Sequence, residues 1–261
     1  MAIVSTFCKK GGVGKSTFVG FMAHYYANQG KKVLIISSDD QNSIFKIFGV
    51  VDDGSQNYLE FLFAKDPALK AELGDILIEA RENLYMIKSL NTDKLSTNLT
   101  NERRYEKEIK KMLTEYSTFF DYIFIDFPPS SNRLTEVFLD LSDCIICVVG
   151  LDTLGLDGFF NTIQYFVDID IDLSAIKYIV PNLYSVNKRA PKKSLEILKT
   201  QAADFTPNAK VLPPISEKSV VRNLQAMGRS PFDNTPLERY DNDENEKLKA
   251  SLLEILKQIE I

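Results

Sequence analysis

Residues 10–17 read Lys-Gly-Gly-Val-Gly-Lys-Ser-Thr, between a short apolar run at residues 2–8 and a segment of helical periodicity at residues 15–29. Glycines in such a loop let consecutive backbone N–H groups turn inward around phosphate oxygens, a curvature that side chains would obstruct. The N-terminus of the following helix adds a favourable dipole. The loop therefore predicts a phosphate site, in which Lys15 reaches the β- and γ-phosphates of a nucleotide and the Ser16 hydroxyl binds Mg²⁺.

Strand-like and helix-like segments alternate along the rest of the chain. Apolar, β-branched runs predict strands at residues 2–8, 31–39, 83–89, 122–127, 144–150, 176–182 and about 210–212. Helices are predicted at residues 15–29, 56–63, 102–116, 158–166, 193–204, 220–228 and 244–259, whereas residues 52–101 give the weakest pattern. This order predicts an α/β P-loop NTPase fold, a doubly wound, mostly parallel sheet with helices on both faces. The 261 residues fit one domain, residues 1–261.

Lys10 stands directly before the glycines, and with it residues 10–17 resemble the deviant Walker A motif of the ParA/MinD family of P-loop ATPases. The resemblance covers nearly the whole chain and is nearest to small ParA-type (Soj-like) partition ATPases without an N-terminal DNA-binding domain. It implies that Lys10 is the signature lysine, which reaches across an ATP-sandwich homodimer to the partner subunit's phosphates. Such a cation offsets charge on the transferring phosphoryl group. The resemblance assigns ATP binding to Lys10, Gly11, Gly12, Val13, Gly14, Lys15, Ser16 and Thr17.

Residues 33–41, Val-Leu-Ile-Ile-Ser-Ser-Asp-Asp-Gln, resemble the family's second motif, DxDPQ. Its second Asp, which orients the attacking water, falls on Asp39. An acidic group at the end of a strand beside the phosphate loop is well placed for in-line attack. The motif's first Asp is Ser37 here and its Pro is Asp40, so the effect on the hydrolysis rate stays open. The implied catalytic residues are Lys10, Lys15 and Asp39.

Two further strand ends complete the expected ATP site. Residues 121–129, Asp-Tyr-Ile-Phe-Ile-Asp-Phe-Pro-Pro, resemble the family's Walker B strand, in which Asp126 holds Mg²⁺ through water. Asn182, at the end of the strand at 176–182, is expected to contact the adenine edge, since an amide both donates and accepts. Residues 187–190 read Asn-Lys-Arg-Ala and lack the Asp of the guanine-reading motif, which favours ATP.

Charge is distributed unevenly along the sequence. The chain carries 31 basic and 36 acidic side chains, a formal net charge of −5. Residues 188–229, the basic segment, hold nine basic and three acidic side chains, a net +6, which leaves −11 elsewhere. Such asymmetry is typical of phosphate-backbone contact, and ParA-type ATPases bind non-specific double-stranded DNA through this part of the chain. The DNA-binding candidates are Lys188, Arg189, Lys192, Lys193, Lys218 and Arg222.

The C-terminal tail tests the main alternative, a MinD-like ATPase that positions itself on a membrane surface. In residues 245–261 three acidic and three basic side chains cancel, and the bulky aromatics of an interfacial anchor are missing. We expect this amphipathic helix to pack on the sheet, and we expect no membrane partner. The N-terminal residues lack the pattern of a signal peptide or membrane anchor.

The three cysteines bear on compartment and on a second alternative, a metal-cluster carrier. An odd cysteine count favours a reducing compartment. Cys144 and Cys147 have the spacing Cys-x-x-Cys, but positions i and i+3 of a strand point to opposite faces, so we expect core residues. The cysteine usage therefore predicts a cytoplasmic protein. The resemblance implies a nucleoid-associated ATPase that segregates or positions a cargo such as a plasmid. The resemblance implies slow hydrolysis stimulated by a ParB-like or other adaptor protein.

Overall fold

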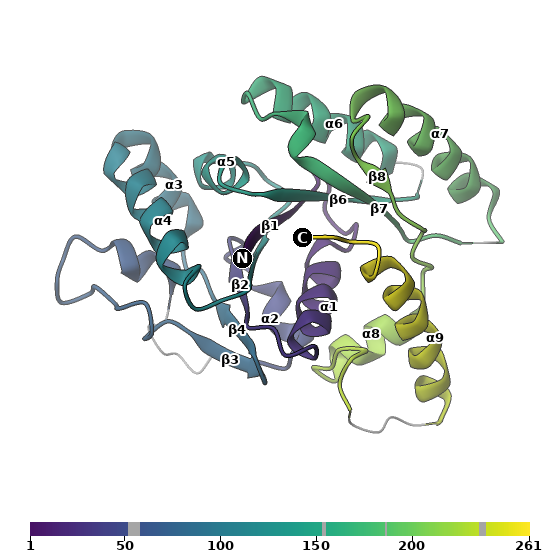
Figure 1. Cartoon of the computed structure of the whole chain (residues 1–261), viewed down its shortest axis with the longest axis horizontal. Coiled ribbons are helices and arrows are strands. Elements are labelled where there is room, and N and C mark those ends of the chain that lie inside the picture. Colours follow the sequence, from purple (N-terminus) through teal and green to yellow (C-terminus); the bar gives the residue numbers. More distant parts are fainter. Residues whose placement is uncertain (52–57, 153–154, 186, 235–238) are drawn as a thin grey trace.

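The computed structural model describes the whole chain except residues 52–57, 153–154, 186 and 235–238. Within the described residues, eight strands form one sheet in the order β3-β4-β2-β5-β1-β6-β7-β8 (Figure 1). Neighbouring strands run parallel except β3 and β4, which pair antiparallel at one edge. The strands are β1 (Ala2–Phe7), β2 (Val33–Ser37), β3 (Ile78–Arg81), β4 (Leu84–Ile87), β5 (Tyr122–Asp126), β6 (Cys144–Gly150), β7 (Ile176–Asn182) and β8 (Lys210–Val211).

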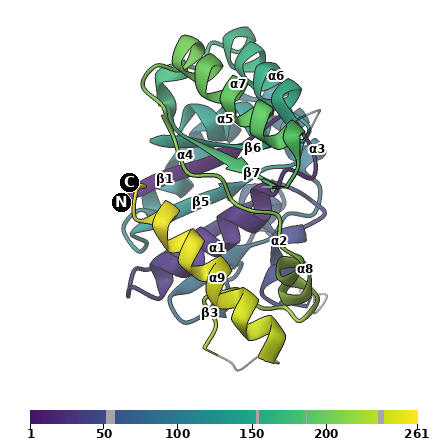
Figure 2. The same ribbon diagram turned by 90° about the vertical axis from the view of Figure 1, so that its right-hand side faces the viewer.

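Helices cover both faces of the sheet (Figures 1 and 2). One face carries α3 (Thr92–Asn101), α4 (Arg103–Tyr116), α5 (Arg133–Asp140), α6 (Gly155–Asp168) and α7 (Arg189–Phe205). The other carries α1 (Lys15–Ala27), α2 (Ser43–Ile47), α8 (Ser219–Ala226) and α9 (Arg239–Leu256). The described part of the chain also has two short 3₁₀ helices in connections, η1 (Leu59–Phe63) and η2 (Leu173–Ala175). The predicted doubly wound, mostly parallel sheet is confirmed.

Alternation along the strands creates the two cores. In β6, Ile145, Cys147 and Val149 belong to the core under α3–α7. Cys144, Ile146 and Val148 belong to the core under α1, α2, α8 and α9. Because side chains alternate across a strand, the two cysteines face opposite sides of the sheet, as predicted. Both thiols are buried, and burial raises the pKa of Cys144 to about 12 and that of Cys147 well above its ordinary value.

The seven predicted strands are all present, but the weakly patterned region held elements that the sequence did not indicate. Helix α3 and strand β3 lie there, and α2 and α5 were also missed. The predicted helix at 56–63 is the 3₁₀ helix η1, and residues 56–57 lie outside the described part. Strand β3 has four residues, lies at the sheet edge and turns back through Asn83, whose φ is 61°. Because the strand is short and lies at the edge, its sequence shows little hydrophobic pattern.

Candidate nucleotide site

The phosphate loop joins β1 to α1 at the carboxyl edge of the sheet. Gly12 and Gly14 adopt φ angles of 74° and 94°, a left-handed conformation that favours glycine. A Cβ on Gly14 would also overlap the Asn182 side-chain amide, so the close approach of β7 requires glycine there. These glycines let the loop curve tightly into the N-terminus of α1, where backbone N–H groups can bind an anion.

Lys15 folds back under the loop instead of extending into solvent. Its Nζ donates to the Cys8 carbonyl at 3.1 Å and to the Lys10 carbonyl at 2.9 Å. Burial lowers the pKa of Lys15, while the nearby thiol of Cys8 and the carboxylates of Asp126 and Asp39 oppose that change. The ammonium group is thus held beside the loop by two neutral carbonyls, partners that a phosphate can replace.

Lys10 points away from Lys15, toward the rim of the site. Its Nζ contacts both carboxylate oxygens of Asp152, at 2.8 and 3.1 Å. The Asp152 side chain is 55% exposed, so this ion pair lies at the surface. A Cβ on Gly158 would lie 2.8 Å from the Lys10 Cβ, so α6 packs directly against this lysine. No sequence pattern indicated that Asp152 would pair with Lys10.

Asp126 ends β5 between β1 and β2, where the strand register places it beside Thr6 and Ser37. Its carboxylate is fully buried, and neither oxygen has a hydrogen-bond partner in the described part of the chain. Burial raises its pKa to about 7; the Ser16 hydroxyl and Lys15 oppose that rise, whereas Asp39 adds to it. An unpartnered buried carboxylate beside a hydroxyl fits a divalent cation.

The surroundings of Asp126 limit how such a cation would be held. No group of three or more His, Cys, Asp or Glu side chains able to hold a metal occurs among the described residues. A Mg²⁺ ion would therefore rely on Ser16, on Asp126 and on oxygens of the nucleotide and water. This is the donor set that Mg²⁺ accepts, since it keeps several waters and binds substrate phosphates.

Asp39 follows β2 in a segment fixed by its own side chains. The Ser37 hydroxyl donates to the Asp39 carbonyl at 2.9 Å, and the Asp39 carboxylate accepts the Gln41 N–H at 3.0 Å. Ser37, which departs from the family motif, therefore stabilises the backbone of Asp39. The Asp39 side chain is half-buried and near enough to affect the pKa values of both Lys15 and Asp126.

A cavity of about 300 Å³ adjoins the phosphate loop and is lined by Gly12, Gly14, Thr17, Asn182 and residues of α8 and α9. The Asn182 amide nitrogen donates to the Val13 carbonyl at 2.8 Å. Gln225 of α8 donates to the Thr17 hydroxyl at 2.8 Å. Gln225 was not predicted, because no sequence pattern links α8 to the loop.

Comparisons with known proteins decide the family. A family model described as an AAA domain matches residues 1–174. The chromosome-partitioning ATPase Soj of Treponema pallidum is 26% identical over 235 residues, which cover 89% of this chain and 87% of that protein. This chain belongs to the ParA/MinD family of P-loop ATPases.

Solved structures share the fold over the full length. Apo McdA of Cyanothece gives a TM-score of 0.78 at 18% identity, covering 99% of this chain and 98% of that one. A putative plasmid partition protein of Borrelia burgdorferi B31, bound to AMPPNP, gives a TM-score of 0.74 at 24% identity, covering 99% of each chain. This chain thus has the fold of both solved structures.

The DNA-binding candidates of this ParA/MinD-family chain fall into two groups. Lys188, Arg189, Lys192 and Lys193 are exposed at the start of α7. Lys188, which precedes α7, and Arg222 of α8 both approach Glu217, at 3.8 and 3.9 Å. Lys218 pairs with Glu244 at 3.2 Å, and only 19% of its side chain is exposed. Lys218 and Arg222 also line the nucleotide cavity, a position that the sequence did not indicate.

The C-terminal helix of this chain packs into the protein core. Within α9 and the residues after it, Leu248, Leu252, Ile255, Leu256 and Ile259 are at most 5% exposed and pack into the core with α1. Tyr26 of α1 donates its hydroxyl hydrogen to the Ile259 carbonyl at 3.3 Å. The predicted packing of this helix is confirmed. In the part of the chain that the structure describes, no helix is long and apolar enough to span a bilayer.

Proposed function

We propose that this protein is an ATP hydrolase that forms an ATP-sandwich homodimer, binds double-stranded DNA non-specifically in that state, and releases it after hydrolysis. The cycle would segregate or position a cargo such as a plasmid. The chromosome-partitioning name of the Treponema relative and the plasmid-partition name of the Borrelia structure support this role. A cytoplasmic, nucleoid-associated location and a ParB-like or other stimulating adaptor are part of the proposal.

The observation that carries the proposal is the placement of Lys10. Lys15 lies inside the phosphate loop, whereas Lys10 lies at its rim on an exposed carboxylate. A surface ion pair of this kind contributes at most about 1 kcal/mol, so a phosphate group can displace Asp152. Lys10 is therefore available to a second subunit in a way that Lys15 is not.

The proposed roles of the other site residues depend on their positions at the carboxyl ends of the strands and in the phosphate loop. Asp126 and Ser16 would hold Mg²⁺, which when bound neutralises charge on the β- and γ-phosphates. Lys15 would bind the same phosphates, and Asn182 the adenine. Asp39 would accept a hydrogen bond from the attacking water, because its segment ends β2 beside the phosphate loop.

Hydrolysis is tested by Asp39→Ala, with Asp40→Ala as the matched control because Asp40 is the adjacent, exposed carboxylate. We expect Asp39→Ala to lower ATP turnover by about 100-fold, the range for removing a positioned general base. Asp40→Ala should stay within about twofold of the unaltered chain. Phosphate release at saturating ATP measures both. Equal turnover in all three proteins would remove Asp39 from the mechanism.

DNA binding is tested by the double variant Arg189→Glu, Arg222→Glu. We expect weaker binding to duplex DNA, and a slope of log affinity against log salt that is smaller by about 2, since two phosphate contacts are lost. The control is Lys110→Glu, Lys111→Glu on the exposed face of α4, which changes the net charge equally. Matching isotherms for both double variants would show that the basic segment is an ordinary solvated surface that does not bind DNA.

A further inference from the structure

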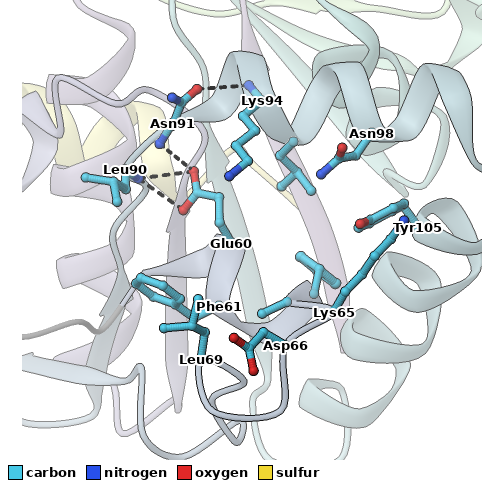
Figure 3. Close-up of a pocket in the computed structure, with 13 residues that line it drawn as sticks. Glu60, Phe61, Lys65, Asp66, Leu69, Leu90, Asn91, Lys94, Asn98 and Tyr105 are labelled. Atoms are coloured by element: carbon cyan, nitrogen blue, oxygen red, sulfur yellow. Dashed lines mark hydrogen bonds between the residues drawn. The ribbon is translucent and has the colours of Figure 1, made fainter.

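A second cavity, of about 540 Å³, lies between η1, the loop after it, α3 and the start of α4 (Figure 3). It shares no lining residue with the nucleotide cavity. Its volume is within the range of small-molecule sites. The ATPase cycle proposed above assigns no role to it.

The cavity has an apolar surface with two exposed leucines. Phe63 and Leu95 are buried behind it, and Phe61 is partly buried. Leu69 and Leu90 are 49% and 53% exposed on its lining. Covering such exposed leucine side chains with an apolar group removes apolar surface from water, which favours binding. The ligand should therefore have an apolar body.

Among the described residues of the cavity, Lys94 is a cation without a counter-ion. Lys65 pairs with Glu102 at 2.6 Å. The Lys94 ammonium has no ion pair or hydrogen-bond partner among the described residues. Figure 3 shows Lys94 and Asn98, one turn apart on α3, projecting into the cavity, with Tyr105 beside them. This polar wall suits one anionic group.

The acidic residues of the cavity already have donors. Backbone N–H groups of Leu90 and Asn91 donate to the Glu60 carboxylate, at 2.8–3.1 Å (Figure 3). One Asp66 oxygen accepts the Ala68 N–H at 2.9 Å. Such hydrogen bonds to an ionised carboxylate are strong, so Glu60 and Asp66 are stabilised in place without Lys94. The Lys94 ammonium is therefore the cation that an incoming anion would contact.

The loop that Glu60 holds is tied on its other side to the segment of Asp39. The Asn42 side chain accepts the Ser89 N–H at 3.0 Å and donates to the Ser89 carbonyl at 2.6 Å. The Ser89 hydroxyl donates to the Ser37 carbonyl at 2.6 Å. Asn42 in turn donates its own N–H to the Asp39 carbonyl at 2.9 Å. The cavity wall and Asp39 are thus joined by successive hydrogen bonds.

We propose that this cavity is a regulatory site for a small amphipathic anion, an apolar body bearing one carboxylate, and that its occupancy raises ATP turnover. The ligand's carboxylate binds Lys94 and its apolar body covers Leu69 and Leu90. A ligand packed against this wall restrains the loop at residues 89–91, and through Asn42 it restrains Asp39. An Asp39 carboxylate held more firmly in place orients the attacking water better, which lowers the barrier to hydrolysis. The second half of this proposal rests on the proposed function, whereas ligand binding does not.

Decanoate, kept below its micelle concentration, is the probe for binding, detected by displacement of the fluorescent anion 8-anilinonaphthalene-1-sulfonate. We expect one saturable site. Lys94→Glu should weaken decanoate about fivefold or more, because an attraction becomes a repulsion. Lys110→Glu, the same change on the exposed face of α4, should leave the affinity unaltered. Equal affinities in all three proteins, or no displacement, would overturn the site.

Turnover is then measured with saturating decanoate. We expect a rise of about twofold or more, equivalent to a small change in the barrier. The rise should be absent in Asn42→Ala, which should still bind decanoate. Lys94-dependent binding with unchanged turnover in the unaltered chain would overturn the regulatory link. A chain that binds decanoate but hydrolyses no ATP would instead contradict the proposed function and leave the site standing.

Discussion

Two lysines of the same loop have different surroundings, which fits the different roles proposed for them. Lys15 is 6% exposed and donates hydrogen bonds to two backbone carbonyls. Lys10 instead pairs with the exposed carboxylate of Asp152, in the connection before α6. The sequence predicted both lysines from the motif alone. It could not predict Asp152 as the partner of Lys10, because 142 residues separate them and only the pairing of β1 with β6 brings them together.

Asp152→Asn tests whether this ion pair competes with dimer formation. Loss of the carboxylate frees Lys10 for the phosphates of a second subunit. We expect ATP-dependent association to strengthen by up to about fivefold, the range of an exposed ion pair. Sedimentation across a concentration series measures it, with Asp157→Asn, exposed on α6, as the control. Weaker association of Asp152→Asn would show that Asp152 supports the dimer instead.

His24, the chain's one histidine, gives stability a pH dependence. It is 3% exposed between Phe48 and Phe232, and burial lowers its pKa to about 4. The unfolded chain, with a pKa near 6.5, takes up the proton first as the pH falls. Stability is therefore present above pH 6.5 and is lost as the pH falls toward 4.

We expect the free energy of unfolding to drop by about 2 kcal/mol between pH 7.5 and pH 5 because of His24. His24→Gln, which cannot titrate, should lack this part of the drop, whatever its stability at pH 7.5. Urea unfolding at the two pH values measures the difference. Identical pH dependence in both proteins would show that His24 is protonated equally in the folded and unfolded chains.

At the scale of elements, the end of α2 is fixed against the end of α8. Gly49 and Gly228 both have positive φ angles, 64° and 65°, and their backbones touch. Arg81 of β3 donates to the carbonyls of Phe48 and Gly228, at 3.0 Å each. Helix α8 carries Gln225, the partner of Thr17. The position of α8 at the nucleotide cavity therefore depends on this contact.

Gly228→Ala tests that contact, because a Cβ there would overlap the Gly49 Cα. We expect a loss of about 3 kcal/mol in the free energy of unfolding, from overpacking and left-handed strain together. Gly30→Ala is the control: its φ is 76°, but a Cβ there meets nothing within 4 Å. It should cost about 1 kcal/mol. Equal losses in urea unfolding would assign the whole effect to backbone conformation.

For the molecule as a whole, the sequence predicted the central sheet because buried parallel strands are long apolar runs. It missed α3 and β3 because few of their residues enter the core. From the sequence, Lys218 and Arg222 were predicted only as part of a basic surface. Their place at the nucleotide cavity depends on how α8 and α9 fold back over α1, which charge patterning does not reveal.

The proposed ATPase cycle depends on a dimer formed through Lys10 around two nucleotides. Asp39→Ala should retain ATP·Mg²⁺ unhydrolysed, so this variant is the protein in which to measure the solution mass by sedimentation. We predict the mass of two chains with ATP·Mg²⁺ and of one chain without it. The double variant Lys10→Ala, Asp39→Ala should keep the mass of one chain under both conditions. A dimer of that double variant, or a single-chain mass for Asp39→Ala with ATP·Mg²⁺, would rule out a sandwich dimer that depends on Lys10.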